Sequence, residues 1–308
     1  MIGVNNKLKA VFEGLRPIQW IKNLSLFAAV ILNGQLLNLP IFYKSLLAFF
    51  VFCFLSSSSY LINDLVDVEK DRLHPVKKNR PIARGDLSES TAIFVAFVLL
   101  FLGLFISIFI GFGFFWISLV FILLQYAYSF FLKKKAVIDI IGIAFFFIIR
   151  AFAGELATGY HLPVWIMLAV IFLSLFLASG KRRSEMGGSG TKTRSSLHGY
   201  SNSLLDFYTN MFAVCTLIAY AMFTFFEEPI TFNGLIHNFL LENFPKALGR
   251  KWYMTTLLPV IFGIMRYGQV IYEMQEGERP EKVIATDIPL ILAIFSWGAV
   301  MITIIYVI

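Results

Sequence analysis

The sequence has little charge and few residues that could build a disulfide framework or a metal cluster. Only 15% of its 308 residues are charged, against about 25% in an ordinary soluble domain, whereas 58% are hydrophobic. The two cysteines, Cys53 and Cys215, lie inside apolar runs, and the four histidines are scattered. These shortages exclude a large water-soluble domain, and they indicate neither a disulfide scaffold nor a zinc site.

Glycine and proline are also scarce and follow no period. The chain has 21 glycines and 10 prolines, fewer together than its 34 phenylalanines. This composition excludes collagen-like, disordered and repeat architectures. The net charge of +7 does not require a nucleic acid partner, because an anionic leaflet and the basic loops of a membrane protein account for it.

Long apolar runs fill most of the sequence. A transmembrane helix needs about 20 apolar residues. We therefore predict an all-α, polytopic membrane protein, one domain over residues 1–308, with nine spanning helices. The first is the weakest because polar residues dilute it. The predicted spans are residues 22–39, 44–63, 89–109, 112–131, 136–157, 162–180, 205–226, 252–272 and 286–307.

Basic residues mark one face of the membrane. Most of the 26 lysines and arginines lie in the N-terminal flank and after the second, fourth, sixth and eighth predicted spans. Because these residues accumulate in loops that stay in the cytoplasm, we expect the N-terminus inside and the C-terminus outside the cell membrane. Residues 1–21 are expected to form an interfacial segment, with Arg16 and Trp20 as its anchors.

Acidic residues concentrate at the cytoplasmic end of the second predicted span. Asp64, Asp67 and Asp71 fall within about a 60° arc of one helix, with Asn63 at its edge. Carboxylates packed that closely repel one another unless a cation neutralises them, and sparse oxygen ligands suit Mg²⁺. We predict all four side chains as Mg²⁺ ligands and the three aspartates as the catalytic residues. The alternative is a solvated helix end whose acids pair with neighbouring basic residues.

A basic loop follows the acidic residues directly. Its side chains, among them Lys77 and Arg80, can face phosphate oxygens beside the acids, and arginine would bind them bidentately. We expect two cytoplasmic loops, residues 64–88 and 181–204, to bind substrate. The alternative is that these charges serve only topology and solvation.

The predicted span over residues 136–157 contains two ionisable side chains. Asp139 and Arg150 lie on one face of the helix, about three turns apart. Charges inside a span are costly and usually face a cavity or a partner. Both are candidates for substrate binding, and an interhelical ion pair or a packing role is the alternative.

Residues 63–85, NDLVDVEKDRLHPVKKNRPIARG, resemble the NDxxDxxxD motif and the following RPxxxG of the UbiA superfamily of intramembrane prenyltransferases. The similarity runs through nearly the whole chain, and it narrows to the decaprenyl-phosphate phosphoribosyltransferase branch. The segments that narrow it are LRPIQWIKN at 15–23, YSFFLKKKAVIDI at 128–140, IIRAFAGELATG at 148–159, SGKRRSEM at 179–186 and MRYGQVIYEMQEGERPEKV at 265–283.

The resemblance implies nine helices around a central cavity that opens to the membrane. It also implies Mg²⁺-dependent transfer of 5-phosphoribose from 5-phosphoribosyl 1-diphosphate to a polyprenyl phosphate, with release of diphosphate. A prenyltransferase with a prenyl diphosphate donor and an aromatic or other acceptor is the alternative. A transporter is disfavoured, because the polar residues gather at one face rather than at the midplane in paired repeats.

One departure from the prenyl-transferring members bears on the substrate. Those members carry a second acidic motif, DxxxD, after helix six, where this chain has Lys181-Arg182-Arg183-Ser184-Glu185. A site that holds several phosphates has more negative charge than one Mg²⁺ balances, so basic residues fit it better. We predict Lys181, Arg182 and Glu185 as substrate-binding residues. Simple positive-inside charge is the alternative.

Three further substrate-binding residues are predicted: Lys22, which could reach a phosphate from the first helix, and Tyr128 and Lys133. The last two resemble a tyrosine and lysine pair of the superfamily, with one more residue between them than the usual YxxxK. This extra residue leaves Lys134 open as the alternative to Lys133.

Overall fold

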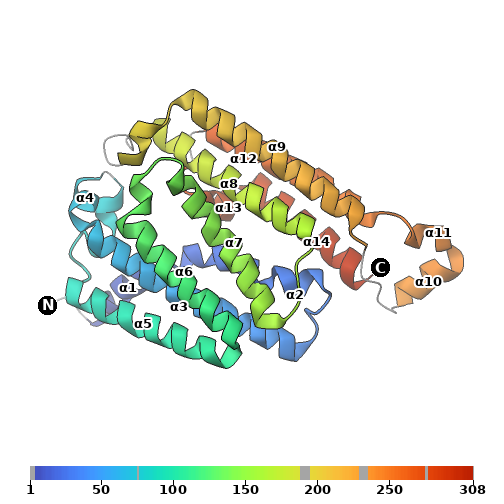
Figure 1. The fold of residues 1–308 in the computed structure, drawn as a ribbon, viewed down its shortest axis with the longest axis horizontal. Coiled ribbons are helices and arrows are strands. Elements are labelled where there is room, and N and C mark those ends of the chain that lie inside the picture. Colours follow the sequence, from blue (N-terminus) through green and yellow to red (C-terminus); the bar gives the residue numbers. More distant parts are fainter. Residues whose placement is uncertain (1–3, 75, 188–194, 229–234, 275–276, 308) are drawn as a thin grey trace.

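The computed structural model describes residues 4–74, 76–187, 195–228, 235–274 and 277–307, and its long helices run side by side in one elongated bundle (Figure 1). All of the regular structure in these residues is helical. In chain order, the elements are α1 (Val4–Leu15), η1 (Pro17–Phe27), α2 (Ala28–Leu32), α3 (Leu39–Val66), α4 (Val68–Leu73), η2 (Lys77–Asn79), α5 (Glu89–Ile110), α6 (Phe112–Phe130), η3 (Leu132–Lys134), α7 (Ile138–Thr158), α8 (Val164–Gly187), η5 (Ser195–Gly199), α9 (Asn202–Phe226), α10 (Leu235–Asn243), α11 (Pro245–Leu248), η6 (Trp252–Thr256), α12 (Leu257–Tyr272), α13 (Pro280–Thr286) and α14 (Ile288–Tyr306).

Eight helices of the described chain are long and apolar enough to cross a membrane, and they coincide in order with eight of the predicted spans. Large apolar side chains such as Phe101 and Phe295 are exposed on the outer faces of these helices. Hydrocarbon chains rather than water suit such a surface. The chain is therefore an all-helical, multi-pass integral membrane protein. The eight spans are Leu39–Val66, Glu89–Ile110, Phe112–Lys134, Ile138–Thr158, Val164–Gly187, Asn202–Phe226, Trp252–Tyr272 and Ile288–Tyr306.

The predicted span at residues 22–39 is not confirmed as a long helix. The chain instead has the short apolar stretch Pro17–Leu32, which begins as a 3₁₀-helix and ends before a turn. A 3₁₀-helix rises about 2.0 Å per residue, against about 1.5 Å in an α-helix. This stretch therefore covers more of the bundle's length than an α-helix of the same number of residues would.

Contacts at the two ends of Pro17–Leu32 show which parts of the chain share an end of the bundle. Arg16, just before it, forms an ion pair with Asp64 at the end of α3. At the other end, the Tyr306 hydroxyl lies 3.1 Å from the carbonyl oxygen of Ile31. The N-terminal and C-terminal regions thus lie at opposite ends of the bundle, and the acidic residues lie at the N-terminal end (Figure 1).

A glycine allows η1 to pack closely on α7. A Cβ atom at Gly154 would overlap the carbonyl oxygen of Leu26, so no larger residue fits without a backbone shift. Leu26 belongs to a buried apolar cluster that includes Phe52 and Phe121. Close packing at Gly154 therefore fixes where η1 lies against the core.

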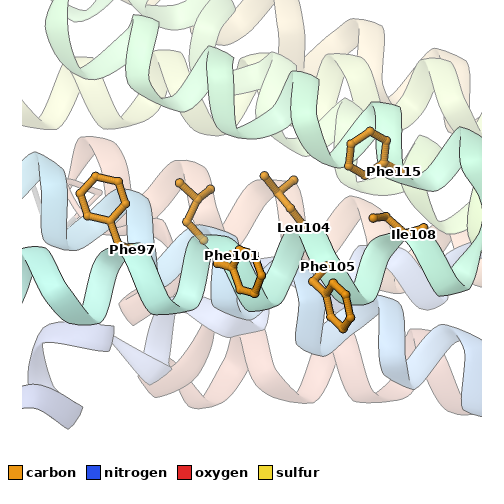
Figure 2. A pocket seen from close by; sticks show the side chains of 7 residues that line it. Phe97, Phe101, Leu104, Phe105, Ile108 and Phe115 are labelled. Atoms are coloured by element: carbon orange, nitrogen blue, oxygen red, sulfur yellow. The ribbon is translucent and has the colours of Figure 1, made fainter.

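An apolar groove lies between α5 and α6 (Figure 2). It has a volume of about 340 Å³, and its lining contains no charged side chain and none of the predicted site residues. A groove of this chemistry fits hydrocarbon chains and not a phosphorylated group. The polar site lies elsewhere. The lining residues are Phe97, Leu100, Phe101, Leu104, Phe105, Ile108 and Phe115.

The substitution Gly154→Ala is expected to destabilise the protein by about 1–3 kcal/mol, because the added methyl group forces η1 away from α7. The melting temperature of the purified protein in detergent measures this effect. Gly268→Ala in α12 is the matched control, because no atom lies within 4 Å of the position that its added methyl group would take. Equal melting temperatures for the two variants would show that the close approach has no energetic role.

Candidate functional site

The acidic segment is a broken helix rather than one straight face. Helix α3 ends at Val66 and α4 begins at Val68, so Asp67 lies at the junction between them. Asp64 and Asp71 are each only 3% exposed, whereas Asp67 is half-buried. Two of the three predicted carboxylates are thus buried at the end of an apolar bundle, where an unpaired charge is costly.

Basic side chains neutralise these carboxylates in two groups. The Arg80 Nη1 atom lies 2.9 Å from Asp64 Oδ1 and 2.5 Å from Asp71 Oδ2, and Arg16 also pairs with Asp64. In the second group, Lys133 Nζ donates to Asp67 Oδ2 at 2.6 Å and to Asn63 Oδ1 at 3.1 Å. Of the two candidate lysines, Lys133 is therefore the one that contacts the acidic motif.

The four predicted magnesium ligands are divided between these two groups, Asp64 with Asp71 at Arg80 and Asn63 with Asp67 at Lys133. Among the described residues, no group of three His, Cys, Asp or Glu side chains is placed to hold a metal ion. Carboxylate oxygens of Asp64 and Asp71 nevertheless converge on a single cationic nitrogen of Arg80. Hard oxygen donors that converge on one cation fit Mg²⁺, which needs only one or two protein carboxylates beside water and phosphate ligands.

The loop after α4 is shaped by a neutral histidine. Burial and the positive charges of Lys77, Arg80 and Arg279 lower the pKa of His74. Its Nδ1 atom accepts hydrogen bonds from the backbone N–H groups of Val76 and Lys77, at 3.2 and 3.3 Å. His74 therefore helps to hold the half-buried side chain of Lys77 on the side of the acidic motif.

Burial also raises the pKa of Asp71, and the negative charge of Asp64 adds to this effect. Arg80 acts in the opposite direction through its charge and its hydrogen bond. The carboxylate form of Asp71 thus depends on a cation beside it. This dependence applies whether the cation is a guanidinium group or a metal ion.

A second network joins the ends of α6, α7 and α8. The Arg182 side chain is 0% exposed. Its Nε atom donates to Asp139 Oδ2 at 2.7 Å, and its Nη2 atom donates to the Tyr128 hydroxyl at 3.2 Å. Arg182 also forms an ion pair with Glu185. The Tyr200 hydroxyl donates to the other Asp139 oxygen at 2.6 Å. Four predicted substrate-binding residues are therefore brought together, and here they bind one another.

Arg150 does not meet Asp139, although both lie on α7. Its Nε atom donates to Asn23 Oδ1 at 2.6 Å, and its guanidinium group lies 4.8 Å from the centre of the Phe121 ring. Within the part of the chain that the structure describes, Arg150 forms no ion pair. Its contact with Asn23 links α7 to η1 one residue after Lys22.

Lys22 lies in a third cluster, with two residues that no sequence motif singles out. Its Nζ atom lies 3.1 Å from Glu281 Oε2 and donates to Gln19 Oε1 at 2.5 Å. The Gln19 amide donates in turn to Glu281 Oε1 at 2.5 Å. Lys181 is half-buried nearby, and its charge acts on Glu281.

Arg16 and Trp20, the expected anchors of an interfacial segment, both contact α3. Arg16 pairs with Asp64 and lies over the Tyr60 ring at 5.3 Å, and the Trp20 indole N–H donates to Ser57 Oγ at 3.0 Å. Both side chains therefore pack on α3. The Arg16 backbone has φ of 55°, a conformation unusual outside glycine, which is the local signal of its special position.

Sequence patterns do not reveal Gln19, Tyr200 and Glu281, for different reasons. Gln19 and Glu281 lie inside two of the segments that carry the family resemblance, but a single uncharged amide and a single acid have no spacing pattern. Tyr200 lies beyond the basic run and is one of 12 tyrosines in the chain. Residues 188–194 of the predicted loop 181–204 lie outside the described residues.

Replacing Arg182 by Met is expected to destabilise the protein by about 3–5 kcal/mol, because it leaves two carboxylates without their buried cation. Arg183→Met is the matched control. The Arg183 side chain is 23% exposed and pairs with the half-buried Asp206 near the surface, so its loss is expected to change stability by less than about 1 kcal/mol. Thermal unfolding in detergent compares the two variants, and similar losses would contradict a structural role for the Arg182 network.

Comparisons with known proteins identify the family of this chain. The model of the UbiA prenyltransferase family matches residues 24–241. The decaprenyl-phosphate phosphoribosyltransferase of Mycolicibacterium smegmatis is 36% identical over 299 residues, which cover 95% of this chain and 91% of that protein. The protein of the same name from Corynebacterium glutamicum is 33% identical over 310 residues, covering 98% of this chain and 88% of that protein.

A solved structure shares the fold. The structure of a UbiA homologue from Archaeoglobus fulgidus bound to DMAPP and Mg²⁺ matches with a TM-score of 0.67 at 20% identity, over 97% of this chain and 99% of that chain. The match of a family model to most of the sequence, together with two relatives above 30% identity, settles the family. The chain belongs to the UbiA prenyltransferase family of membrane-embedded transferases.

Proposed function

We propose that this protein transfers 5-phosphoribose from 5-phosphoribosyl 1-diphosphate to a polyprenyl phosphate of the decaprenyl type and releases diphosphate. The observation that carries the proposal is the similarity, over almost the full length, to proteins named decaprenyl-phosphate phosphoribosyltransferase. The clusters of basic side chains at one end of the bundle support it. Donor and acceptor together would bring several phosphate groups to that end.

The acidic motif would hold Mg²⁺ through Asp64 and Asp71, with Asp67 and Asn63 beside them. When bound, the ion supplies positive charge to the departing diphosphate. These residues fit the ion because two of their carboxylate oxygens already converge on the Arg80 guanidinium. Divalent cation binding is thus proposed for the end of α3, where the chain breaks into α4.

The basic residues around this motif would bind phosphate oxygens. Arg16, Arg80 and Lys133 pair with the aspartates here. A divalent cation at the carboxylates would release these side chains toward a diphosphate, which arginine binds bidentately. They would then stabilise the negative charge that develops on the leaving group, the largest electrostatic need of the reaction.

In the transfer itself, the bond between C1 of the ribose and the diphosphate oxygen breaks, and a bond forms from C1 to an oxygen of the lipid phosphate. The sugar carbon becomes oxocarbenium-like as the diphosphate leaves. The lipid phosphate is already ionised at neutral pH, so it needs no strong general base. We therefore assign no residue as a base.

An assay of donor choice tests this function directly. The purified protein is expected to transfer label from 5-phosphoribosyl 1-diphosphate to polyprenyl phosphate, and Asp67→Asn is expected to lower turnover at least about a hundredfold. Asp86→Asn is the matched control, because Asp86 is exposed and pairs with Arg84 away from the motif. Transfer of a prenyl group from a prenyl diphosphate, with no use of the phosphoribosyl donor, would favour a prenyltransferase instead.

We further propose that the acidic motif faces the cytoplasm of a cell membrane, because the basic residues gather at its end of the bundle. In a variant whose native cysteines are replaced by alanine, a cysteine at exposed Ser90 should react with an impermeant maleimide only in inverted vesicles. A cysteine at exposed Leu37, at the opposite end, should react in intact cells. The reverse labelling pattern would overturn the orientation.

A further inference from the structure

The end of the bundle holds a second cluster of polar groups, beside the acidic motif but separate from it. The cluster consists of Gln19 and Lys22 on η1, Lys181 and Ser184 on α8, Tyr267 on α12 and Glu281 on α13. Four elements far apart in sequence thus meet here. This cluster is called the Glu281 cluster below.

The carboxylate of Glu281 is the centre of this cluster. It is only 5% exposed, and it contacts both Gln19 and Lys22 directly. Burial alone would raise the pKa of Glu281, but the charges of Lys22 and Lys181 and the Gln19 hydrogen bond bring it down to about 2. The ammonium groups of Lys22 and Lys181 therefore both act on this carboxylate, and the carboxylate of Glu185 also acts on Lys181.

Lys181 differs from Lys22 because it forms no direct ion pair with Glu281 in the described chain. Its side chain is half-buried, and across the described residues it forms no hydrogen bond or ion pair. A partly buried ammonium group without a direct partner is unfavourable unless an anion can join it. Lys181 is therefore placed to receive an anion from outside the chain.

Two buried hydroxyl groups near Lys181 also lack partners. Tyr267 and Ser184 are each 2% exposed, and neither hydroxyl has a hydrogen-bond partner among the described residues. A Cβ atom at Gly180, next to Lys181, would lie 3.6 Å from the Tyr267 ring, and Ser184 follows Lys181 by one turn of α8. Ammonium groups and hydroxyl donors from neighbouring helices are groups that can bind phosphate oxygens.

We propose that Glu281 is a positioning residue that, with Gln19, holds the ammonium groups of Lys22 and Lys181 for a phosphate group of a substrate. The carboxylate reduces the repulsion between the two lysines and fixes the side chain of Lys22 through the Gln19 bridge. The lysines bind the phosphate, and Glu281 acts through them. This inference rests on the proposed function for its substrates.

The Glu281 cluster lies close to the acidic motif. Arg16, which pairs with Asp64, and Gln19, which donates to Glu281, are three residues apart in the chain, about one 3₁₀ turn. A second phosphate group of the bound substrates can therefore lie here while a diphosphate lies at the aspartates. That group is either the 5-phosphate of the sugar donor or the phosphate of the lipid acceptor. Both are phosphate monoesters with the same chemistry.

Steady-state kinetics with each substrate varied in turn test the role of Glu281. Glu281→Gln is expected to raise the KM of one phosphorylated substrate about tenfold, because a lysine that contacts its phosphate is no longer held in position by the carboxylate. The substrate whose KM rises identifies the bound phosphate. Glu273→Gln, which removes an exposed acid near the end of α12, is the matched control and is expected to leave both KM values unchanged.

A double-mutant cycle separates positioning from a purely structural role. If Glu281 acts through the lysines, Glu281→Gln should add little to the KM of a Lys22→Gln/Lys181→Gln variant, because interacting residues are not additive. Full additivity, or an unchanged KM in folded Glu281→Gln, would overturn the proposal. If Glu281→Gln does not fold, Gln19→Met removes the bridge to Lys22 without deleting the buried acid, and the same cycle applies.

Titration with inorganic phosphate in the presence of EDTA tests the subsite without turnover. Lys181→Gln is expected to weaken phosphate binding about tenfold, whereas Lys282→Gln, at an exposed lysine next to Glu281, is expected to leave it unchanged. If phosphate binding depends on Lys181 but the protein does not use the phosphoribosyl donor, the proposed function is refuted and the phosphate subsite is still supported. Phosphate binding that is independent of Lys181 would refute the subsite itself.

Discussion

A carboxylate buried at the end of an apolar bundle needs a cation beside it, and this requirement organises the polar end of the protein. Asp64 and Asp71 both form ion pairs with Arg80, and Asp67 forms one with Lys133. In the same way, Asp139 pairs with Arg182 and Glu281 pairs with Lys22. In each pair, the acid and the base come from different elements. Charge neutralisation therefore fixes how the helix ends and loops pack on one another.

The stretch from Arg16 to Asn23 connects three parts of this arrangement. Arg16 reaches the acidic motif, Gln19 and Lys22 reach Glu281, and Asn23 reaches Arg150 inside the bundle. A straight α-helix repeats every 3.6 residues, whereas a 3₁₀-helix repeats every 3.0, so side chains three apart point the same way. Gln19 and Lys22 have that spacing inside η1 and both meet Glu281, whereas Arg16 precedes the helix and reaches Asp64 from a left-handed backbone conformation.

The sequence predicts the apolar helices well, because length and composition alone specify a membrane span. The span predicted at residues 22–39 is not confirmed, because polar side chains such as Asn23 and Asn33 shorten the apolar run there and form hydrogen bonds with other elements. The acidic motif is predictable from its spacing, but the break at Asp67 is not, because nothing in the local spacing marks it. Partners such as Arg16, Tyr200 and Glu281 depend on tertiary contacts, which one sequence does not display.

The basic run at 181–185 shows how neighbouring charges of one sign can have different roles. Residues on successive positions of a helix point in different directions, so Lys181, Arg182 and Arg183 cannot share one partner. Arg182 turns into the bundle and is balanced by Asp139 and Glu185, and Arg183 pairs with Asp206 at the edge of α9. Only Lys181 faces Glu281 without a direct ion pair in the described chain. Three consecutive basic residues of α8 thus have three different environments, and the environment of each depends on the direction in which its side chain leaves the helix.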